Sequence, residues 1–299
     1  MKIDLHIHTS TGSDGAFSVE EVFREAGNRK IDMISITDHD SMDCQERAIV
    51  LDKEYQIAYI TGVELNVTFQ YNIGEQNDNS PQEEPAKSFS LDFLGYGYDI
   101  NNEEMKNKLA LMREHRDGRA RQILEKLNIE FDKEGIERLT GDDILKIDES
   151  VDGALGRPHI ANYLVEKGVV GGYQEAFDKY LVRLDVPKYP LSLAEASGVV
   201  REAGGVLVLA HPNDPHGTSL LSITGDLDEQ AAIIEKYMLQ YIDGVECWHS
   251  RHDAVTTAHY VEFARKNGLL ITGGSDCHQK PVIMGTLDIP DRVAGQFRR

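Results

Sequence analysis

The segment MKIDLHIHTSTGSDGAF, residues 1–17, decides the fold class that we expect. Apolar residues at positions 3, 5 and 7 alternate with polar ones, which is the pattern of a β-strand. Side chains two residues apart leave a strand on the same face, so His6 and His8 can meet one ion. Such pairs also occur on ordinary exposed strands, and the spacing alone leaves that alternative open. A polar, glycine-containing loop follows and carries Asp14, which places the pair at the carboxyl end of a strand, where α/β enzymes build their sites.

Strands and helices alternate beyond this segment. The sequence predicts helices from Ser18 and over 46–53, and strands over 32–40, 57–67 and 88–99. The alternation resumes late in the chain with helices over 192–203, 227–240 and 254–266, and strands over 205–212, 243–249 and 268–278. This order is typical of an α/β fold built on a parallel sheet or barrel.

A helical segment interrupts the alternation. Apolar residues recur three and four apart from 102 to 128, and helical patterns follow over 140–147, 158–167 and 173–181 with no strand between them. We therefore expect residues 101–186 to form a helical insertion domain and residues 1–100 and 187–299 to form one discontinuous domain. The polar stretch between Tyr71 and Ser88 has no periodicity and is interpreted as a hairpin-like excursion or loop.

Composition bounds the classes of function. The chain has 299 residues, of which 40% are hydrophobic, enough for one large core or a core with a subdomain. Its formal net charge of −20 repels a nucleic-acid backbone, so we expect no long nucleic acid as a partner. A small anionic substrate meets the same repulsion unless bound divalent cations reverse the potential inside the site. Acidity is therefore compatible with metal dependence.

Apolar runs and cysteines indicate the compartment. No stretch approaches the roughly 20 apolar residues that a membrane span needs, and the chain enters a strand without a basic and apolar leader. Cys44, Cys247 and Cys277 are odd in number and far apart, which favours a reducing compartment and indicates neither a disulfide framework nor a zinc site of paired cysteines. We expect a cytoplasmic protein with no membrane partner.

Polar side chains also lie at the ends of other predicted strands. His39 lies in TDHD, Glu64 in GVE, His211 in LAHP, and Asp276 and His278 in SDCH. Packing does not explain them, because such groups are costly to bury unpaired. Imidazoles mixed with carboxylates suit manganese, iron or zinc, and their number exceeds what one ion needs. We infer two or three divalent metal ions, a kind of centre that serves the hydrolysis of phosphate esters.

In this order, the motifs DLHIH, TDHD, GVE, AHP and GSDCH resemble those of the PHP (polymerase and histidinol phosphatase) superfamily. The resemblance implies a distorted seven-stranded β/α barrel made of residues 1–100 and 187–299. LGYGYD and GRPHIA further resemble the stand-alone bacterial phosphoesterases of that superfamily that act on nucleotide-like phosphates. The metal ligands that the resemblance implies are His6, His8, Asp14, His39, Glu64, His211, Asp276 and His278.

The family pattern also implies how the ligands are shared. One ion is held by His6, His8, Glu64 and Asp276, another by Asp14, His39 and His278, and Glu64 bridges two ions. A further site is expected from Glu64, His211 and position 92. Many relatives read VHILGY where this chain reads LDFLGY, so Asp92 stands where a histidine ligand is often found. Aspartate can ligate a divalent ion, but its shorter reach and negative charge would alter the affinity or metal preference of that site.

Substrate contacts are expected from the helical segment. GRPH places Arg157 just before Pro158, which favours the first turn of a helix, and His159 follows at once. A guanidinium suits a phosphate, and the resemblance points Arg157 and His159 toward the substrate. A capping or salt-bridged pair on the surface of the insertion is the alternative. Arg116 interrupts the apolar stripe of the long helix and either lies at the surface edge or neutralises charge on the phosphate.

The stretch CWHSRHDA, residues 247–254, supplies a further candidate. Relatives read EVYYPSH here, which aligns His252 with the terminal histidine of their motif. His252 is therefore a candidate to contact the phosphate or to protonate the leaving oxygen. His249 is the weaker candidate.

These features predict a metal-dependent phosphoric ester hydrolase. Its expected substrate is a small phosphorylated molecule, first a nucleoside mono- or bisphosphate, attacked by a metal-bound hydroxide. A cyclic-phosphate or phosphodiester hydrolase, including a short-oligonucleotide exonuclease, shares these motifs, and the sequence does not separate them. A non-catalytic metal-binding module is the alternative of another class, and the intact ligand set argues against it.

Overall fold

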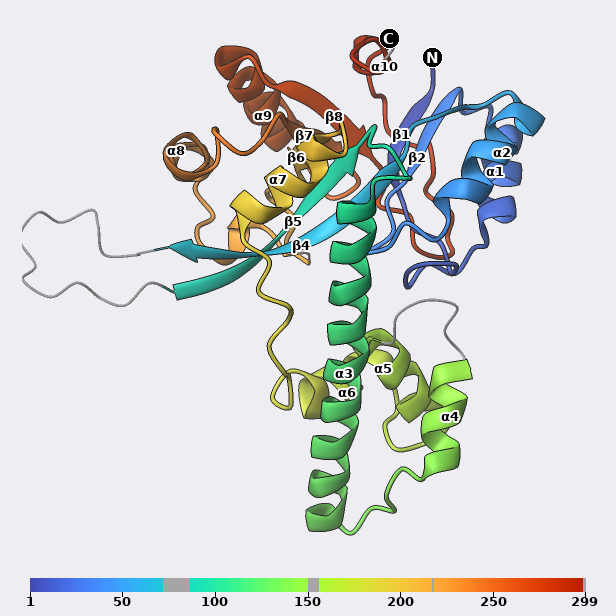
Figure 1. Cartoon of the computed structure of the whole chain (residues 1–299). Helices are drawn as coiled ribbons and strands as arrows, with labels where there is room; N and C mark the ends of the chain where they lie inside the picture. Colours follow the sequence, from blue (N-terminus) through green and yellow to red (C-terminus); the bar gives the residue numbers. More distant parts are fainter. Residues whose placement is uncertain (72–86, 150–155, 217, 298–299) are drawn as a thin grey trace, which may run out of the picture.

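The computed structural model describes residues 1–71, 87–149, 156–216 and 218–297 and has a mixed α/β fold (Figure 1). Within these residues, eight strands form two sheets. The three-stranded sheet is parallel and consists of β1 (Ile3–Ile7), β2 (Met33–Ile36) and β3 (Ala58–Tyr59). The five-stranded sheet is mixed and consists of β4 (Gly62–Tyr71), β5 (Lys87–Tyr96), β6 (Val206–Leu209), β7 (Gly244–His249) and β8 (Leu270–Gly274). Strands β4 to β6 pair antiparallel, and β6 to β8 pair parallel.

The two sheets meet where the predicted site lies. Ile7 at the end of β1 bridges to Cys277, just after β8, and His39, just after β2, bridges to Glu64 of β4. These are isolated bridges, so both sheets are open and the expected closed seven-stranded barrel is not confirmed. The β4–β5 pair, ten residues in each strand, runs out beyond the other strands (Figure 1).

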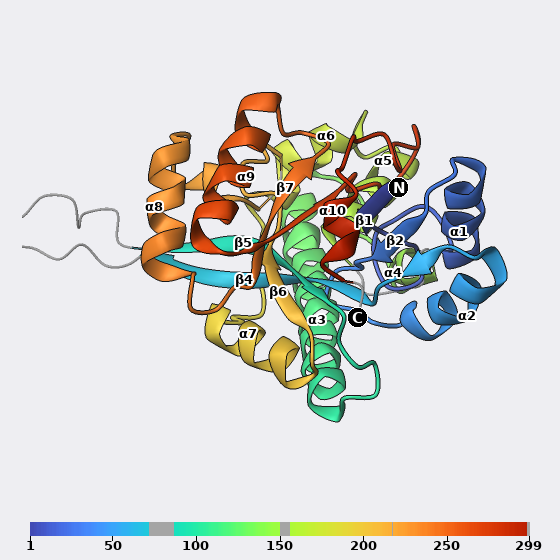
Figure 2. The same cartoon turned by 90° about the horizontal axis from the view of Figure 1, so that it is seen from above.

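Helices cover both sheets. Apolar side chains of α1 (Val19–Asn28) and α2 (Gln45–Tyr55) form one hydrophobic cluster with those of the three-stranded sheet. Around the five-stranded sheet lie α7 (Leu193–Glu202), the short helix η2 (Leu220–Ser222), α8 (Leu227–Tyr237), α9 (Ala254–Asn267) and α10 (Arg292–Gly295) (Figure 2). The side chains of His8, His39, His211, His249 and Asp276 lie at or just after the carboxyl ends of β1, β2, β6, β7 and β8.

Helix α1 begins with a complete capping box. Ser18 Oγ accepts a hydrogen bond from the Glu21 N–H at 3.3 Å, and the Ser18 N–H donates to Glu21 Oε2 at 3.0 Å. We expect Ser18→Ala to lower the free energy of unfolding by about 1 kcal/mol, because one N–H of the first turn loses its acceptor. Urea unfolding followed by circular dichroism measures this change. Ser18→Asp should keep most of the stability, since aspartate caps as well as serine, and equal losses in both variants would contradict the assignment.

The long helix α3 (Glu103–Glu134) belongs to two hydrophobic clusters. Met105, Leu109 and Met112 pack with side chains of the five-stranded sheet. Further along the helix, Ile123 and Phe131 belong to a second cluster formed by the helical segment itself. Around this half of α3 gather α4 (Gly141–Glu149), α5 (Arg157–Glu166), α6 (Tyr173–Ala176) and the π-helical turn η1 (Phe177–Leu181) (Figure 1).

The helices expected between residues 101 and 186 are present, and the described part of this range contains no strand. The division of the chain into a helical insertion domain and a discontinuous domain stays a prediction. The expected excursion between Tyr71 and Ser88 lies for the most part outside the described residues and stays a prediction too.

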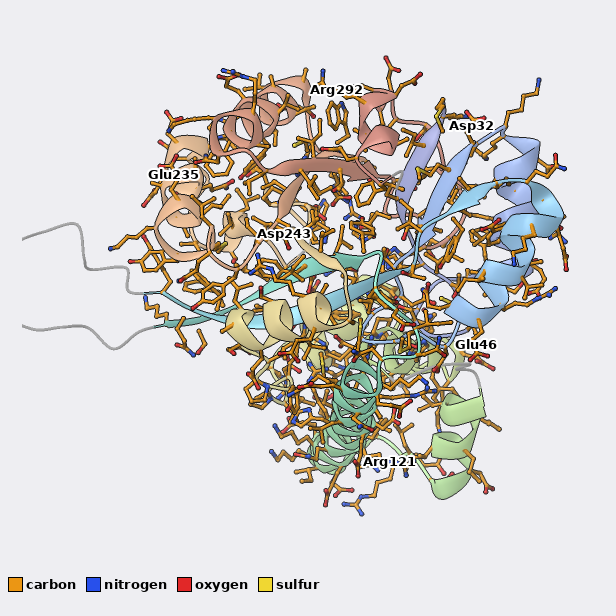
Figure 3. All side chains as sticks on the ribbon, turned by 45° about the horizontal axis from the view of Figure 1, so that its top comes forward. Asp32, Glu46, Arg121, Glu235, Asp243 and Arg292 are labelled. Carbon is orange, nitrogen blue, oxygen red and sulfur yellow. The ribbon has the colours of Figure 1, made fainter. Side chains whose placement is uncertain are left out.

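Charged side chains dominate the outer surface. Glu46 of α2, Arg121 of α3, Glu235 of α8 and Arg292 of α10 are exposed and project away from the body of the protein (Figure 3). Among the described residues, no helix is both long enough and apolar enough to cross a membrane.

Candidate metal centre

The end of β1 places two histidines side by side. His6 and His8 are fully buried, and their Nε2 atoms lie 3.1 Å apart. The loop after β1 is tied to the chain beyond β8, because the Ala16 N–H donates to the His278 carbonyl oxygen at 2.6 Å. This connection brings Asp14 and His278 to the same place.

Two carboxylates face this pair. Glu64 Oε2 lies 3.3 Å from His6 Nε2 and 3.2 Å from His8 Nε2. Asp276 Oδ1 lies 3.4 Å from His6 Nε2 and 3.3 Å from His8 Nε2. His6 and His8 therefore face both carboxylates that were expected to share one ion with them. Ligand atoms of His6, His8 and Asp276 lie within 4.8 Å of one another, and Glu64 forms such a group with His6 and His211.

A second group forms beside the first. Asp14 Oδ1 lies 3.4 Å from His278 Nε2 and 3.8 Å from His39 Nε2. Together with His8, these residues offer ligand atoms within 4.8 Å of one another. The expected second set, Asp14, His39 and His278, is thus also together in space.

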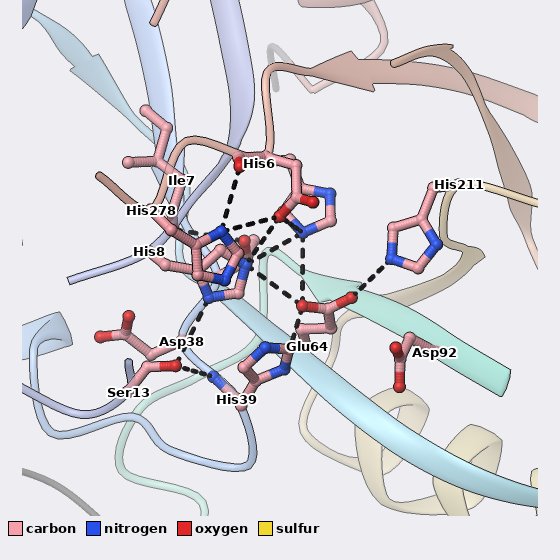
Figure 4. A network of polar contacts seen from close by, with 12 residues as sticks. His6, Ile7, His8, Ser13, Asp38, His39, Glu64, Asp92, His211 and His278 are labelled. Atoms are coloured by element: carbon pink, nitrogen blue, oxygen red, sulfur yellow. Dashed lines mark hydrogen bonds and ion pairs between the residues drawn. The ribbon is translucent and has the colours of Figure 1, made fainter. Parts of the chain in front are cut away.

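Glu64 extends toward a third position. Its Oε1 lies 3.0 Å from His211 Nε2, while Oε2 lies 3.1 Å from His39 Nδ1 (Figure 4). Asp92 does not join them, because it belongs to none of the groups of described residues that could hold an ion. Each of its carboxylate oxygens accepts one hydrogen bond, from the Asn66 amide and from the Thr218 hydroxyl. Burial, and then the charge of Glu64, raises the pKa of Asp92 to about 6.

The charges of the cluster fit divalent cations. Burial alone would raise the pKa of Glu64, but the neighbouring His39 and His6 hold it well below its usual range. Burial alone would lower the pKa of His8, but hydrogen bonds to Asp276 and Glu64 raise it to about 10. Buried carboxylates and imidazoles that stabilise each other's charge in this way are the groups that bind divalent ions when deprotonated. His211 Nδ1 is buried and has no hydrogen-bond partner among the described residues.

Residues behind the ligands orient them, and sequence reasoning missed these. Glu246 of β7 is fully buried, with Oε1 3.1 Å from His6 Nδ1, and its Oε2 accepts the His211 N–H at 2.8 Å. Asp38 accepts hydrogen bonds from the Thr9 N–H and hydroxyl, each at 2.6 Å, and so fixes the loop after His8. The tripeptide GVE, which occurs at 62–64 and again at 244–246, was a signal for Glu246.

The cluster opens into a cavity of about 980 Å³ between the sheets and the helical segment. The wall of this cavity carries lysine and arginine side chains, which are absent from the ligand cluster itself. The cationic side chains of the lining are Arg116, Arg119, Arg157, Lys188, Arg251 and Lys280. Lys188 and Arg251 were not singled out by the sequence, because nothing in their local pattern distinguishes them from surface cations.

Of the three substrate-binding candidates in the helical segment, two line the cavity and one does not. Arg116 lines the cavity and donates from Nη1 to the His39 carbonyl oxygen at 3.3 Å. Arg157 also lines it, with Nη1 donating to Asp185 Oδ2 at 3.0 Å. His159 is not part of the lining; its Nδ1 accepts the Gly156 N–H at 3.1 Å and caps α5. The structure favours the capping alternative for His159, because the first turn of the helix uses its ring.

Of the two histidines at and after the end of β7, the weaker candidate lies closer to the metal centre. His252 is not part of the cavity lining, and its ring stacks on Tyr260 of α9, with Nδ1 3.1 Å from the Cys247 carbonyl oxygen. Burial lowers the pKa of His252 to about 4. His249, the weaker candidate, is the one at the centre, with Nε2 3.4 Å from Asp276 Oδ2. The chain turns after β7, where the His252 N–H donates to the His249 carbonyl oxygen at 3.0 Å, and the His252 ring lies between His249 and Tyr260.

Arg251 follows His249 and closes this side of the cavity. Its Nη1 lies 2.6 Å from Asp214 Oδ2 and 3.6 Å from Asp276 Oδ2. Asp214, His249 and Asp276 could form a further ligand group. A guanidinium already satisfies the charge of Asp214 there.

Comparisons with known proteins agree with this site. The sequence pattern of the PHP domain matches residues 4–186. The chain is 28% identical over 287 residues to a 3',5'-nucleoside bisphosphate phosphatase of Chromobacterium violaceum, covering 92% of this chain and 87% of the relative. It is 28% identical over 284 residues to the 5'-3' exoribonuclease Rnm of Escherichia coli, covering 92% and 85%. A metal-dependent phosphoesterase of Bifidobacterium adolescentis has a similar structure, with a TM-score of 0.75 and 28% identity, covering 98% of this chain and 94% of that one.

The fold, the ligand clusters and these relatives define a metal-dependent hydrolase of phosphate esters. The chain belongs to the PHP domain family, whose pattern covers more than half of its length. The match runs from β1 to the end of the helical segment, and the candidate ligands His211, Asp276 and His278 follow after it. The expected family and the general activity are confirmed.

Proposed function

We propose that the chain hydrolyses the phosphate ester of a small nucleotide-like molecule, a nucleoside mono- or bisphosphate. One observation carries the proposal: the buried ligand cluster and the wall of cationic side chains face the same cavity. A cavity of about 980 Å³ suits a molecule of nucleotide size, since small-molecule pockets reach roughly 1,000 Å³. The relative named a 3',5'-nucleoside bisphosphate phosphatase supports this substrate class.

The donor set suits manganese, iron or zinc. His6, His8, Glu64 and Asp276 would hold one ion. Asp14, His39 and His278 would hold another. Divalent ions held there would supply an activated water as nucleophile and positive charge for the phosphoryl oxygens.

Side chains of the cavity wall bind and orient the phosphate. Arg157 is fixed from two sides, by Asp185 and by the ring of Phe177, whose centroid lies 5.7 Å from the guanidinium carbon. A fixed guanidinium loses little freedom on binding a phosphate through two parallel hydrogen bonds. Arg116 adds positive charge beside His39. We assign no step to His252, because it lies outside the cavity lining.

The helical segment supplies recognition in this proposal. Arg116 and Arg119 of α3, Arg157 of α5 and Tyr173 of α6 all line the cavity, and every metal-ligand candidate lies outside residues 101–186. We therefore propose that this segment is an insertion domain that selects the substrate, while the strand ends perform the chemistry.

The size of the substrate is inferred from the net charge of the protein, and the compartment of the protein is inferred from its cysteines. A net charge of −20 disfavours long nucleic acid, so we propose a small substrate. Cys44, Cys247 and Cys277 are free and buried, which supports a reducing compartment, the cytoplasm.

A cyclic-phosphate or phosphodiester hydrolase is the second candidate. It is favoured by the exoribonuclease Rnm and by a phosphoribosyl 1,2-cyclic phosphate 1,2-diphosphodiesterase of Eggerthella lenta, 24% identical over 281 residues. Hydrolysis of p-nitrophenyl phosphate, its bis-ester and the p-nitrophenyl ester of thymidine monophosphate, with and without manganese, separates the candidates. A preference for the monoester supports the proposal, and a preference for the diesters overturns it. Adenosine mono- and bisphosphates, short oligonucleotides and a cyclic phosphate then identify the substrate class.

Arg157→Ala tests the recognition role of the wall. Loss of a charge-assisted hydrogen bond to phosphate costs on the order of 1.5 to 3 kcal/mol, so kcat/KM should fall roughly tenfold to a hundredfold. The metal content, measured by mass spectrometry of the dialysed protein, should stay at the wild-type level. Arg183→Ala is the matched control, because Arg183 pairs with Glu130 outside the cavity lining. Loss of metal together with activity would show that Arg157 supports the centre, and no change in either would place it with the surface cations.

A further inference from the structure

The candidate ligand groups share members, which limits how many ions they can hold. His6 belongs to a group with His8 and Asp276 and to another with Glu64 and His211. Its Nδ1 lies 3.1 Å from Glu246 Oε1, so only Nε2 can coordinate. An ion bound by His6, His8, Glu64 and Asp276 therefore leaves the third position without His6.

The first ion leaves different numbers of ligands to the second and third metal positions. The second group keeps Asp14, His39 and His278 after His8 is assigned to the first ion. Three protein ligands are the usual number at a catalytic metal with an open position. The third position keeps only His211 and Glu64 Oε1, which is too few.

Asp92 lies outside the ligand groups of the described residues, so it does not supply the missing ligand. Each of its oxygens accepts one hydrogen bond, from Asn66 on the neighbouring strand β4 and from Thr218 in the loop after β6. Figure 4 shows its carboxylate beside the Glu64–His211 pair, with no interaction drawn to either. The two hydrogen bonds hold the short side chain on the wall of the cavity.

A lysine occupies the same wall. Lys188 lies between η1 and α7, is half-buried, and lines the cavity together with Glu64, Asp92 and His211. No hydrogen bond or ion pair joins its ammonium to another residue in the part of the chain that the structure describes. The carboxylates of Asp92 and Asp40 are its nearby counter-charges. An ammonium in this environment is available to an anion in the cavity.

The geometry points to a centre of two metal ions in which the ammonium of Lys188 provides the positive charge at the third position and binds an oxygen of the substrate phosphate. Asp92 holds the counter-charge of the lysine and is not a metal ligand. The phosphate contact rests on the proposed function, whereas the number of ions does not. Lysine binds phosphate as a point charge, so it can replace the electrostatic action of a cation without a coordination sphere.

Metal counting tests the first half of the proposal. Protein that has been stripped, reloaded with manganese and dialysed should contain two ions per chain, measured by mass spectrometry against protein concentration. Lys188→Ala and Asp92→Asn should also contain two. The double variant Asp92→His/Lys188→Ala should retain a third ion, because an imidazole reaches further and the competing ammonium is gone.

Three results would overturn the two-ion centre. They are three retained ions in the wild type, loss of one ion in Asp92→Asn, and a folded double variant that stays at two. The single variants keep the test decisive if the double variant does not fold.

Kinetics and phosphate binding test the second half. Lys188→Ala should lower kcat/KM roughly tenfold to a hundredfold and weaken inhibition by inorganic phosphate by a similar factor, with two ions retained. Lys188→Arg should restore part of both. Lys106→Ala, an exposed lysine of α3 paired with Glu103, is the matched control.

Failures of the two proposals are distinguishable. Unchanged kcat/KM and phosphate inhibition in Lys188→Ala would remove the role of the lysine and leave the proposed function intact. A wild type that retains two ions and hydrolyses none of the esters would remove the proposed function and leave the two-ion centre.

Discussion

Glu64→Ala should reduce kcat/KM by on the order of 10³-fold or more and remove metal from the protein. The carboxylate lies within 3.3 Å of His6, His8, His39 and His211, so it contacts histidines of all three expected metal positions. Removing even a hydrogen-bond partner of a ligand commonly costs 10- to 100-fold, and loss of a bridging ligand should exceed that. Rates with p-nitrophenyl phosphate and metal content by mass spectrometry measure both effects.

A matched control separates the metal effect from a general loss of charge. Glu46→Ala removes an exposed carboxylate of α2 and should keep wild-type rates and metal content. Circular dichroism of Glu64→Ala checks that the fold is retained. Wild-type activity and metal content in folded Glu64→Ala would remove Glu64 from the centre.

Glu246→Gln should weaken manganese binding by roughly 10- to 100-fold while the volume of the side chain is kept. Glu246 Oε1 lies beside His6 Nδ1 and so turns the opposite nitrogen, Nε2, toward the cluster. The neutral amide keeps the shape but loses the charge that makes His6 a stronger ligand. Competition with a metal chelator measures the affinity.

Two further observations make this prediction specific. The burial of Glu246 among the strands means that any misfolding would also disturb Trp248 on the same strand, so tryptophan fluorescence reports the local fold. Gln230→Glu changes the charge of another buried side chain, one that bonds Tyr260 and not a ligand, and should leave manganese affinity near the wild-type value in folded protein. If Glu246→Gln bound manganese as tightly as the wild type, Glu246 would be only a packing residue.

Much of the fold was predictable because its signals are local. The period-two pattern at positions 3, 5 and 7 and the capping residue Ser18 predict β1 and α1, and both are present. Whether the sheets close into a barrel is a property of the whole assembly. It depends on how strands far apart in the sequence pair, such as β1 with the chain after β8, and no short stretch of sequence encodes that pairing.

The candidate site, like the fold, could be predicted only where its signals are local in the sequence. Strand ends carry imidazoles and carboxylates in sequence, so the gathering of His6, His8, Glu64 and Asp276 could be anticipated. Lys188 could not, because its importance comes from the cavity that surrounds it and not from its neighbours in the chain. The sequence also could not show which of His249 and His252 lies at the metal centre, since the turn after β7 decides which ring faces it.

Helix α3 couples the stability of the two regions that it joins. Its residues up to Met112 are anchored among the strands, and those from Ala120 belong to the helical cluster. Unfolding of this helix would therefore remove buried apolar contacts from both clusters. The cavity arginines Arg116 and Arg119 lie in that shared turn, next to Gly118, the residue of lowest helix propensity in α3. Any bending of the helix at this glycine would therefore change the shape of the cavity wall before it loosened either hydrophobic cluster.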